Sequence, residues 1–325
     1  MDMPTLPIGK PPLCRRWRDL LLVVLILLLL ASAALAQGAP GARPLTVAFA
    51  QDTLGNDWQR AQTQGLEAAF RRHPDIRFIH TDAGGSSAQQ VQDIEDLVAR
   101  GIDLLITSPR DAALMAPVIE RVKARGIPVI LLSRRTTSDA HDSFIRADNR
   151  DIARQAARRL AARMGGQGRI LMLQHIPTTT PAIERTEGFL EELRRYPAMR
   201  VVAVKRADSL RDKAILATEE ALAEGLAFDA IYAQSDSMAA GARTALRRAG
   251  IEPRTIPTTG IDYIAEAREA IRAGEQDASF VYPTFAAEGA DIAVRILRGE
   301  KVPHEIVVPS QMVTRDNVER VEPIF

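Results

Sequence analysis

The stretch SAQQVQDIEDLVARGIDLLITSPRDAALMAPVIERVKARGIPVILL, residues 87–132, decides the fold class. Apolar residues recur at helical spacing in its first part and predict a helix from Ser87 to Arg100, with one face formed by Val91, Ile94, Leu97 and Val98. Two apolar runs follow, Leu104-Leu105-Ile106 and Val129-Ile130-Leu131-Leu132. Neither run alternates with polar residues, which is typical of parallel strands covered on both faces.

The same alternation of apolar runs and amphipathic stretches continues from Leu45 onward. The predicted strands are Leu45–Ala50, Ile76–His80, Asp103–Thr107, Pro128–Leu132, Ser143–Arg146, Arg169–Leu173, Arg200–Val204, Asp229–Ala233, Pro257–Gly260 and Ala278–Tyr282. Glycines such as Gly101 and Gly126 are expected to end helices in the left-handed conformation. These strands are too many for one ordinary open sheet, so we predict an α/β fold of two doubly wound parallel-sheet lobes.

The N-terminal segment predicts export. The apolar run Leu20–Leu30 follows the basic segment Arg15–Arg18 and precedes small residues that end at Ala36. We expect Sec export, cleavage after about Ala36 and a periplasmic mature protein. Retention as a membrane anchor is the alternative, because residues 20–36 are at the lower limit for spanning a bilayer.

Composition narrows the classes of function. The chain has a formal charge of +1 and its leader carries +2, so the mature protein at −1 has no broad field for nucleic acid or anionic lipid. Cys14 is the single cysteine and leaves with the leader. Gly165–Gly168 lacks the Lys-Ser/Thr of a phosphate-binding loop and is interpreted as a helix-ending turn, and His175 has no supporting pair of carboxylates. We expect neither catalysis nor a cofactor or metal.

Polar residues follow the predicted strands, where ligands bind in doubly wound folds. They include Gln51-Asp52, Ser133-Arg134, Asp148-Asn149, Ser235-Asp236 and Asp262-Tyr263. Amide, guanidinium and carboxylate groups pair well with vicinal hydroxyls, and the nearby Trp58 offers a ring for stacking on a sugar. The pattern favours a neutral polyhydroxylated ligand.

The order and spacing of several motifs resemble the type I periplasmic sugar-binding proteins, and are similar to the ribose- and galactofuranose-binding members. The resemblance covers about Leu45 to Asn317. Its motifs are Gly101-Ile102-Asp103, Gly126-Ile127-Pro128-Val129, Ala147-Asp148-Asn149, Arg185-Thr186-Glu187-Gly188-Phe189, Ser235-Asp236-Ser237-Met238, Gly260-Ile261-Asp262 and Val313-Thr314-Arg315-Asp316-Asn317.

This resemblance implies two lobes joined by a three-segment hinge that close over one sugar. The implied N-terminal lobe is 44–146 plus 283–308, and the implied C-terminal lobe is 147–282 plus 309–325. The closed, monomeric form would be recognised by the permease of an ABC importer. A sensor kinase or chemoreceptor is the alternative partner, and the identity of the sugar or polyol stays open.

Site residues are carried over from the family by position. The expected ligand-binding residues are Gln51, Asn56, Trp58, Arg134, Asp148, Arg185, Ser235, Asp236, Asp262 and Tyr282. Trp58 is the expected stacking platform, whereas Asp148 and Asp236 fit helix caps equally well.

The chain departs from the family pattern at three serines. Ser133 stands in place of an Asp, Ser235 in place of an Asn, and Ser209 where an aromatic residue often closes the site. These departures argue against plain ribose as the ligand.

Overall fold

A computed structural model describes residues 43–325 of this protein. The predicted leader, with its apolar run and its cleavage site at Ala36, lies outside the described residues. Within residues 43–325, no helix combines the length and the hydrophobicity that crossing a membrane requires.

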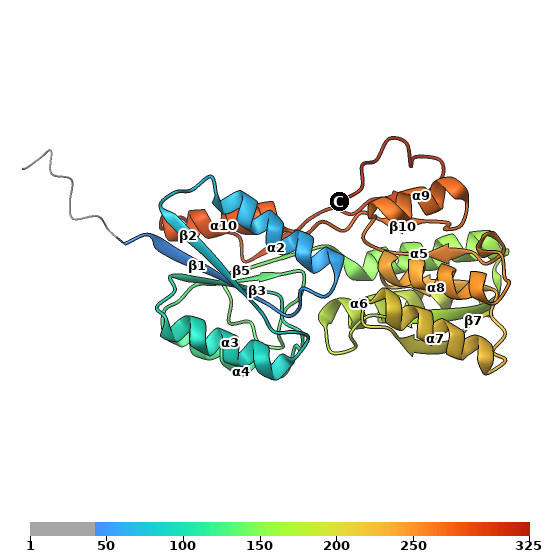
Figure 1. The fold of residues 1–325 in the computed structure, drawn as a ribbon, viewed down its shortest axis with the longest axis horizontal. Helices are drawn as coiled ribbons and strands as arrows, with labels where there is room; N and C mark the ends of the chain where they lie inside the picture. Colours follow the sequence, from blue (N-terminus) through green and yellow to red (C-terminus); the bar gives the residue numbers. More distant parts are fainter. Residues whose placement is uncertain (1–42) are drawn as a thin grey trace, which may run out of the picture. The chain divides into compact units, whose positions relative to one another are not determined.

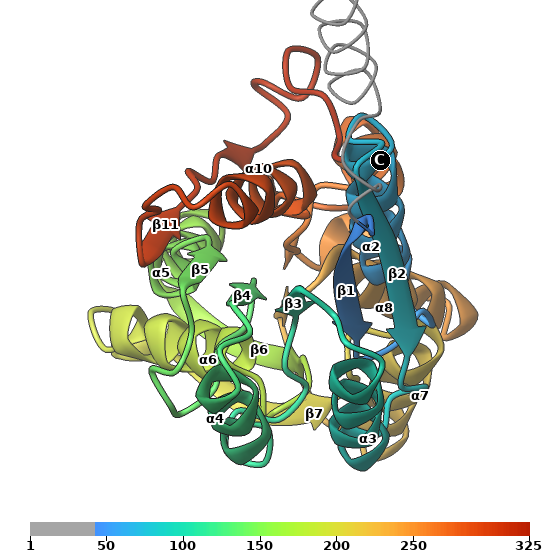
Figure 2. The ribbon, with the colours of Figure 1, turned by 90° about the vertical axis from the view of Figure 1, so that its left-hand side faces the viewer.

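The first lobe is built on a six-stranded parallel sheet with the order β11-β5-β4-β3-β1-β2 (Figure 1). Its strands are β1 (Leu45–Gln51), β2 (Ile76–Asp82), β3 (Leu104–Thr107), β4 (Val129–Leu132), β5 (Ser143–Arg146) and β11 (Glu305–Val307). Its helices are α2 (Asp57–Phe70), α3 (Ser87–Ala99), α4 (Ala116–Ala124) and α10 (Ala286–Leu297). Figure 2 shows α2 and α10 on one face of this sheet and α3 and α4 on the other.

The second lobe is built on a four-stranded parallel sheet with the order β7-β6-β8-β9. Its strands are β6 (Gln167–Gln174), β7 (Ala198–Arg206), β8 (Ala230–Ala233) and β9 (Thr258–Thr259). Its helices are α5 (Asn149–Met164), α6 (Thr180–Leu193), α7 (Arg211–Ala223), α8 (Asp236–Arg248) and α9 (Ala265–Ala273), with a 3₁₀ turn at η1 (Pro253–Thr255). Helices α5 and α6 pack on one face of the sheet, and α7 and α8 on the other.

The chain passes between the two lobes three times, as the family resemblance implies. It leaves the first sheet after β5, returns to α10 after β10 (Ser279–Phe280), and crosses again between β11 and β12 (Met312–Val313). Strands β10 and β12 pair antiparallel beside the second lobe. The two-lobe α/β prediction is therefore confirmed.

All ten predicted strands are present, with bounds that differ by a few residues. Gly101 and Gly126 have φ values of 76° and 77°, so they end their helices in the predicted left-handed conformation. Strands β11 and β12 were not predicted. Both are very short, and β11 has no fully buried residue, so neither has the apolar run by which the other strands were recognised.

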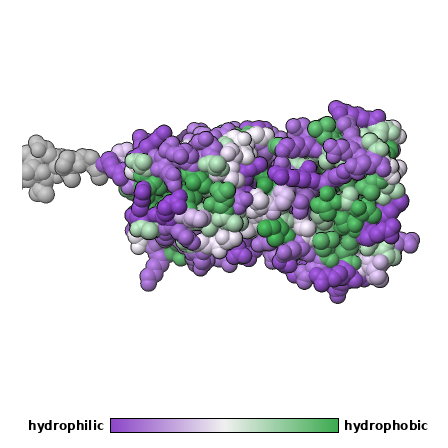
Figure 3. Space-filling view, turned by 90° about the horizontal axis from the view of Figure 1, so that it is seen from below, coloured by the Kyte–Doolittle hydropathy of each residue, from purple (hydrophilic) through white to green (hydrophobic). Residues whose placement is uncertain are grey.

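Polar residues cover most of the surface seen in Figure 3, and apolar residues gather over the second lobe. The exposed large apolar side chains of that lobe include Ile183 and Leu190 on α6, Val204 on the edge strand β7 and Leu216 on α7. Their exposure has no explanation in the contacts of the described residues.

A buried carboxyl group joins three segments of the second lobe. Asp236, the first residue of α8, accepts hydrogen bonds from Tyr263 N and Ser279 Oγ at 2.6 Å each, and from Gln276 Nε2 at 2.7 Å. A side chain at Gly260 would meet Asp236 Oδ1 at 2.0 Å. Close approach therefore requires a glycine here, and Asp236 connects α8 to the turn after β9 and to β10.

That turn has an unusual backbone. Asp262 has a φ of 121° and Tyr263 a φ of 60°, conformations that cost about 1–3 kcal/mol for each non-glycine residue. The hydrogen bond from Tyr263 N to Asp236, together with that from Asp262 N to Phe280 O, holds the turn in place. Asp236 thus fixes the backbone that carries Asp262.

We predict that Asp236→Asn changes how stability depends on pH. Burial raises the pKa of Asp236 from 3.8 to about 6. The stabilising contribution of the protonated group is therefore full below pH 3.8 and is lost as the pH rises through about 6. Between about pH 4 and about pH 7, the free energy of unfolding of the native chain should fall relative to the variant by up to about 3 kcal/mol in urea titrations.

The exposed carboxylate of Asp212, in the first turn of α7, provides the control. Asp212→Asn should leave the pH dependence of unfolding unchanged. The free energies of unfolding of the native chain and of Asp236→Asn are compared at about pH 4 and about pH 7. A difference between the two proteins that is the same at both pH values would contradict the assigned role of Asp236.

Candidate ligand-binding site

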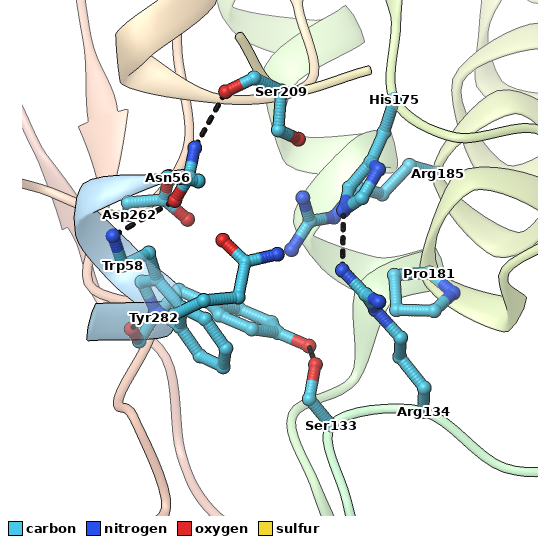
Figure 4. Close-up of a pocket in the computed structure, with 11 residues that line it drawn as sticks. Asn56, Trp58, Ser133, Arg134, His175, Pro181, Arg185, Ser209, Asp262 and Tyr282 are labelled. Carbon is cyan, nitrogen blue, oxygen red and sulfur yellow. Dashed lines mark hydrogen bonds between the residues drawn. The ribbon is translucent and has the colours of Figure 1, made fainter. Parts of the chain in front are cut away.

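One cavity lies where the two lobes meet (Figure 4). The residues that line it come from the turns after several strands, from the starts of α2 and α6, and from a crossing segment: Asn56, Trp58, Gln59, Ser133, Arg134, His175, Pro181, Arg185, Ser209, Asp262 and Tyr282.

Asn56 connects the two lobes directly. It is the N-cap of α2, where its Oδ1 accepts a hydrogen bond from Trp58 N at 2.8 Å. Its Nδ2 donates to Ser209 O, in the turn after β7 of the second lobe, at 2.5 Å. Asparagine is a favoured N-cap residue, and here the same side chain also forms the bond between the lobes.

Trp58 lies beside the crossing segment, with 7% of its surface exposed. Its Nε1 donates to Tyr282 O at 3.1 Å, and its ring centre is 5.8 Å from that of Tyr282 and 6.4 Å from that of Phe285. Trp58 therefore both fills the core of the hinge and lines the cavity. The Tyr282 hydroxyl in turn lies 2.9 Å from Ser133 Oγ.

Arg134 is almost fully buried at the end of β4. Its Nη1 donates to Asp52 Oδ2 at 2.8 Å, and Arg110 Nη1 donates to the same oxygen at 3.1 Å. Two guanidinium groups thus share one buried carboxylate. The neighbouring Arg135 is exposed.

Arg185, on α6, is held by uncharged groups. Its Nε donates to Asn149 Oδ1 at 2.9 Å and its Nη1 to Gln234 O at 2.6 Å. The guanidinium carbon lies 4.5 Å from the centre of the Tyr282 ring, a cation–π contact. These contacts fix the direction of the guanidinium toward the cavity.

Burial shifts the pKa values of two residues in the lining, Asp262 and His175. It raises the pKa of Asp262 well above 3.8, although the charge of Arg185 acts in the opposite direction. It lowers the pKa of His175 well below 6.5, and the charges of Arg134, Arg185 and Arg110 lower it further. His175 is therefore neutral at physiological pH.

Two lining atoms have unmet hydrogen-bonding capacity. Gln59 Oε1 and Ser209 Oγ are buried and have no hydrogen-bond partner among the described residues. An unmet buried polar atom costs about 1–3 kcal/mol. A ligand that offers hydroxyl groups would satisfy both atoms.

Six of the ten predicted residues line the cavity: Asn56, Trp58, Arg134, Arg185, Asp262 and Tyr282. The other four lie outside its lining for local reasons. Gln51 turns its amide back onto Gln59 O and Gln62 Oε1, and Asp148 and Ser235 cap α5 and α8. Asp236 is occupied by the contacts described above.

Sequence reasoning omitted five lining residues from its set: Gln59, Ser133, His175, Pro181 and Ser209. Ser133 and Ser209 were noted only as departures from the family pattern. His175 follows a strand, which is the signal used for the other residues, but the sequence offers it no supporting pair of carboxylates. Gln59 and Pro181 carry no comparable signal in the sequence.

One group of residues within 43–325 has the composition of a metal site. Ligand atoms of Asp139, His141 and His304 lie within 4.8 Å of one another. These residues precede β5 and β11, so they lie at the amino ends of those strands, whereas the cavity residues follow carboxyl ends. The cavity lining itself contains one carboxyl group and one imidazole, and its other polar groups are suited to hydrogen bonding.

Comparisons with known proteins agree with this geometry. Residues 47–301 match the family described as periplasmic binding protein domain. The chain is 27% identical over 301 residues to the xylitol-binding protein of Mycolicibacterium smegmatis, covering 87% of this chain and 85% of that protein. It is 26% identical over 278 residues to the ribose import binding protein of Bacillus subtilis, covering 84% and 88%.

A solved structure supports the same assignment. The fructose-binding periplasmic domain of a hybrid two-component system aligns with a TM-score of 0.81 and 29% identity, covering 85% of this chain and 92% of that domain. The match of the family over most of the chain, with the two-lobe fold and the cavity, shows that this chain belongs to the periplasmic binding protein family.

Proposed function

We propose that this chain captures a monosaccharide or a related polyol between its lobes and delivers it to an ABC importer. The observation that carries the proposal is the cavity, in which two guanidinium groups, a carboxyl group and amides surround a space beside Trp58. Such groups exchange hydrogen bonds with several hydroxyls at once. Relatives named for xylitol and ribose support this class of ligand.

The proposal includes export and lobe closure. A Sec leader would be removed after about Ala36 and the mature chain would act in the periplasm as a monomer. The lobes would comprise 44–146 plus 283–308 and 147–282 plus 309–325, and would rotate about the three crossings. The permease would recognise the closed arrangement.

Binding of useful strength is consistent with this site. Micromolar affinity corresponds to about −8 kcal/mol. Five or six hydrogen bonds of about 0.5–3 kcal/mol each supply that amount after entropic losses. The proposed binding residues are the six predicted ones in the lining together with Gln59, Ser133, His175 and Ser209.

A sensory role is the second candidate, and the structural match to a domain of a two-component system favours it. A strain that lacks the gene separates the two roles. Transport predicts lost uptake of the radiolabelled ligand, whereas sensing predicts normal uptake and a lost transcriptional response. Loss of uptake that persists after constitutive expression of the importer would exclude a purely sensory role.

Arg134→Met should weaken saccharide binding by about 10–100-fold, because hydrogen bonds to charged groups contribute about 1.5–3 kcal/mol. Isothermal titration calorimetry measures this change. Arg135→Met removes the same charge from an exposed neighbour and should leave affinity within about twofold, since surface substitutions have small effects. Equal affinities of the two variants would contradict the placement of Arg134 in the site.

Ligand binding should change the emission of Trp58, which is the single tryptophan left when the leader with Trp17 is removed. The indole lies in the cavity wall, so a bound ring alters its surroundings. A fluorescence screen against pentoses, hexoses, furanoses and polyols tests this expectation. Trp58→Phe is the control, because it should abolish the signal. A ligand that binds in calorimetry and leaves the emission of the native chain unchanged would contradict the expected change in Trp58 emission.

A further inference from the structure

The polar groups of the cavity are unevenly distributed. Figure 4 shows Arg134, His175 and Arg185 together on one side, and Asn56 and Asp262 on the opposite side. The hydroxyls of a neutral sugar can accept on one side and donate on the other. A carboxylate, which only accepts, suits the side of the guanidinium groups alone.

On the side of Arg134, His175 and Arg185, here called the basic side, the guanidinium groups outnumber the carboxylates that pair with them. Arg134 and Arg110 donate to the same oxygen of Asp52, and the other oxygen, Oδ1, is buried with no partner among the described residues. One negative charge thus faces two positive charges. The side chains of Arg134 and Arg110 are only 2% and 14% exposed, so water screens them poorly.

Arg185 adds a third positive charge without an ion pair. Its hydrogen bonds go to an amide oxygen and a backbone carbonyl, and no carboxylate lies within ion-pair distance of it among residues 43–325. Asp262 is the carboxyl group of the lining, and burial raises the pKa of Asp262 well above its ordinary value. Burial thus disfavours the charged form of the carboxyl group that shares the cavity with Arg185.

His175 lies on the same side. Its Nε2 is 3.4 Å from Arg134 Nη2, and its pKa is lowered well below 6.5 by burial and by the charges of Arg134, Arg185 and Arg110. His175 therefore places a neutral ring, and no negative charge, beside the guanidinium groups.

We propose that the ligand is a monosaccharide or sugar derivative that carries a carboxylate, as in a uronate or an aldonate. Its carboxylate lies among Arg134, His175 and Arg185, and its hydroxyl groups lie toward Asp262, Asn56 and the unmet Gln59 Oε1. This inference rests on the proposed function, and it narrows the ligand from monosaccharides and polyols in general to acidic derivatives.

Calorimetry on the mature chain tests the proposal with matched pairs of ligands. D-galacturonate is compared with D-galactose, D-glucuronate with D-glucose, and D-gluconate with D-sorbitol. At least one acid should bind about tenfold or more tightly than its neutral counterpart, because only the acid supplies the missing negative charge. Neutral members that bind as tightly as the acids, or more tightly, would overturn the inference and leave saccharide binding intact.

A substitution at Ser133 provides the charge-specific readout. Ser133 lines the cavity next to Arg134 and has a φ of 64°, a conformation that Asp and Asn tolerate well. Ser133→Asp adds a carboxylate to the basic side and should weaken binding of the acid by about tenfold, through repulsion between like charges. Ser133→Asn introduces a side chain of the same shape as aspartate without its charge. It should therefore weaken binding of the acid much less than Ser133→Asp does.

The outcomes separate this inference from the proposed function. Equal loss of acid binding in Ser133→Asp and Ser133→Asn would contradict the placement of a ligand carboxylate on the basic side. Absence of binding by all six compounds would overturn the acidic ligand, whereas the capture of saccharides itself is decided by the wider fluorescence screen of pentoses, hexoses, furanoses and polyols.

Discussion

Parallel pairing of strands is the constraint on which the rest of this structure depends. Because the strands of each large sheet run in one direction, the turns after their carboxyl ends gather at one edge. The three crossings bring these edges of the two lobes together. Asn56 and Asp262 lie far apart in the chain, yet this arrangement places both in the wall of the same cavity.

Placing charged groups in that wall requires other contacts that fix them. Asp52 is fully buried and receives two guanidinium groups, while Arg185 is held by an amide, a carbonyl and the ring of Tyr282. Desolvation of such charges is costly when they lack partners. The supporting contacts keep the guanidinium groups in place before any ligand arrives, which reduces the entropy lost on binding.

The sequence was sufficient for the fold and for much of the site. Runs such as Val129–Leu132 identify buried strands, and positions directly after strands identify Arg134 and Asp262, because both signals are local. The direction of a side chain, in contrast, depends on residues from other segments of the chain. Gln51 follows the same rule, but its amide turns into the interface with α2, and His175 becomes part of the lining only through neighbours from other segments.

Asn56 performs two tasks with the two atoms of one amide. Its oxygen caps α2 and its nitrogen reaches Ser209 O in the other lobe. An aspartate at this position would keep the acceptor and lose the donor. Loss of the donor would remove the bond between the lobes and so weaken their closed arrangement. A single nucleotide change, from asparagine to aspartate, could therefore shorten the dwell time of a captured solute and keep the helix cap.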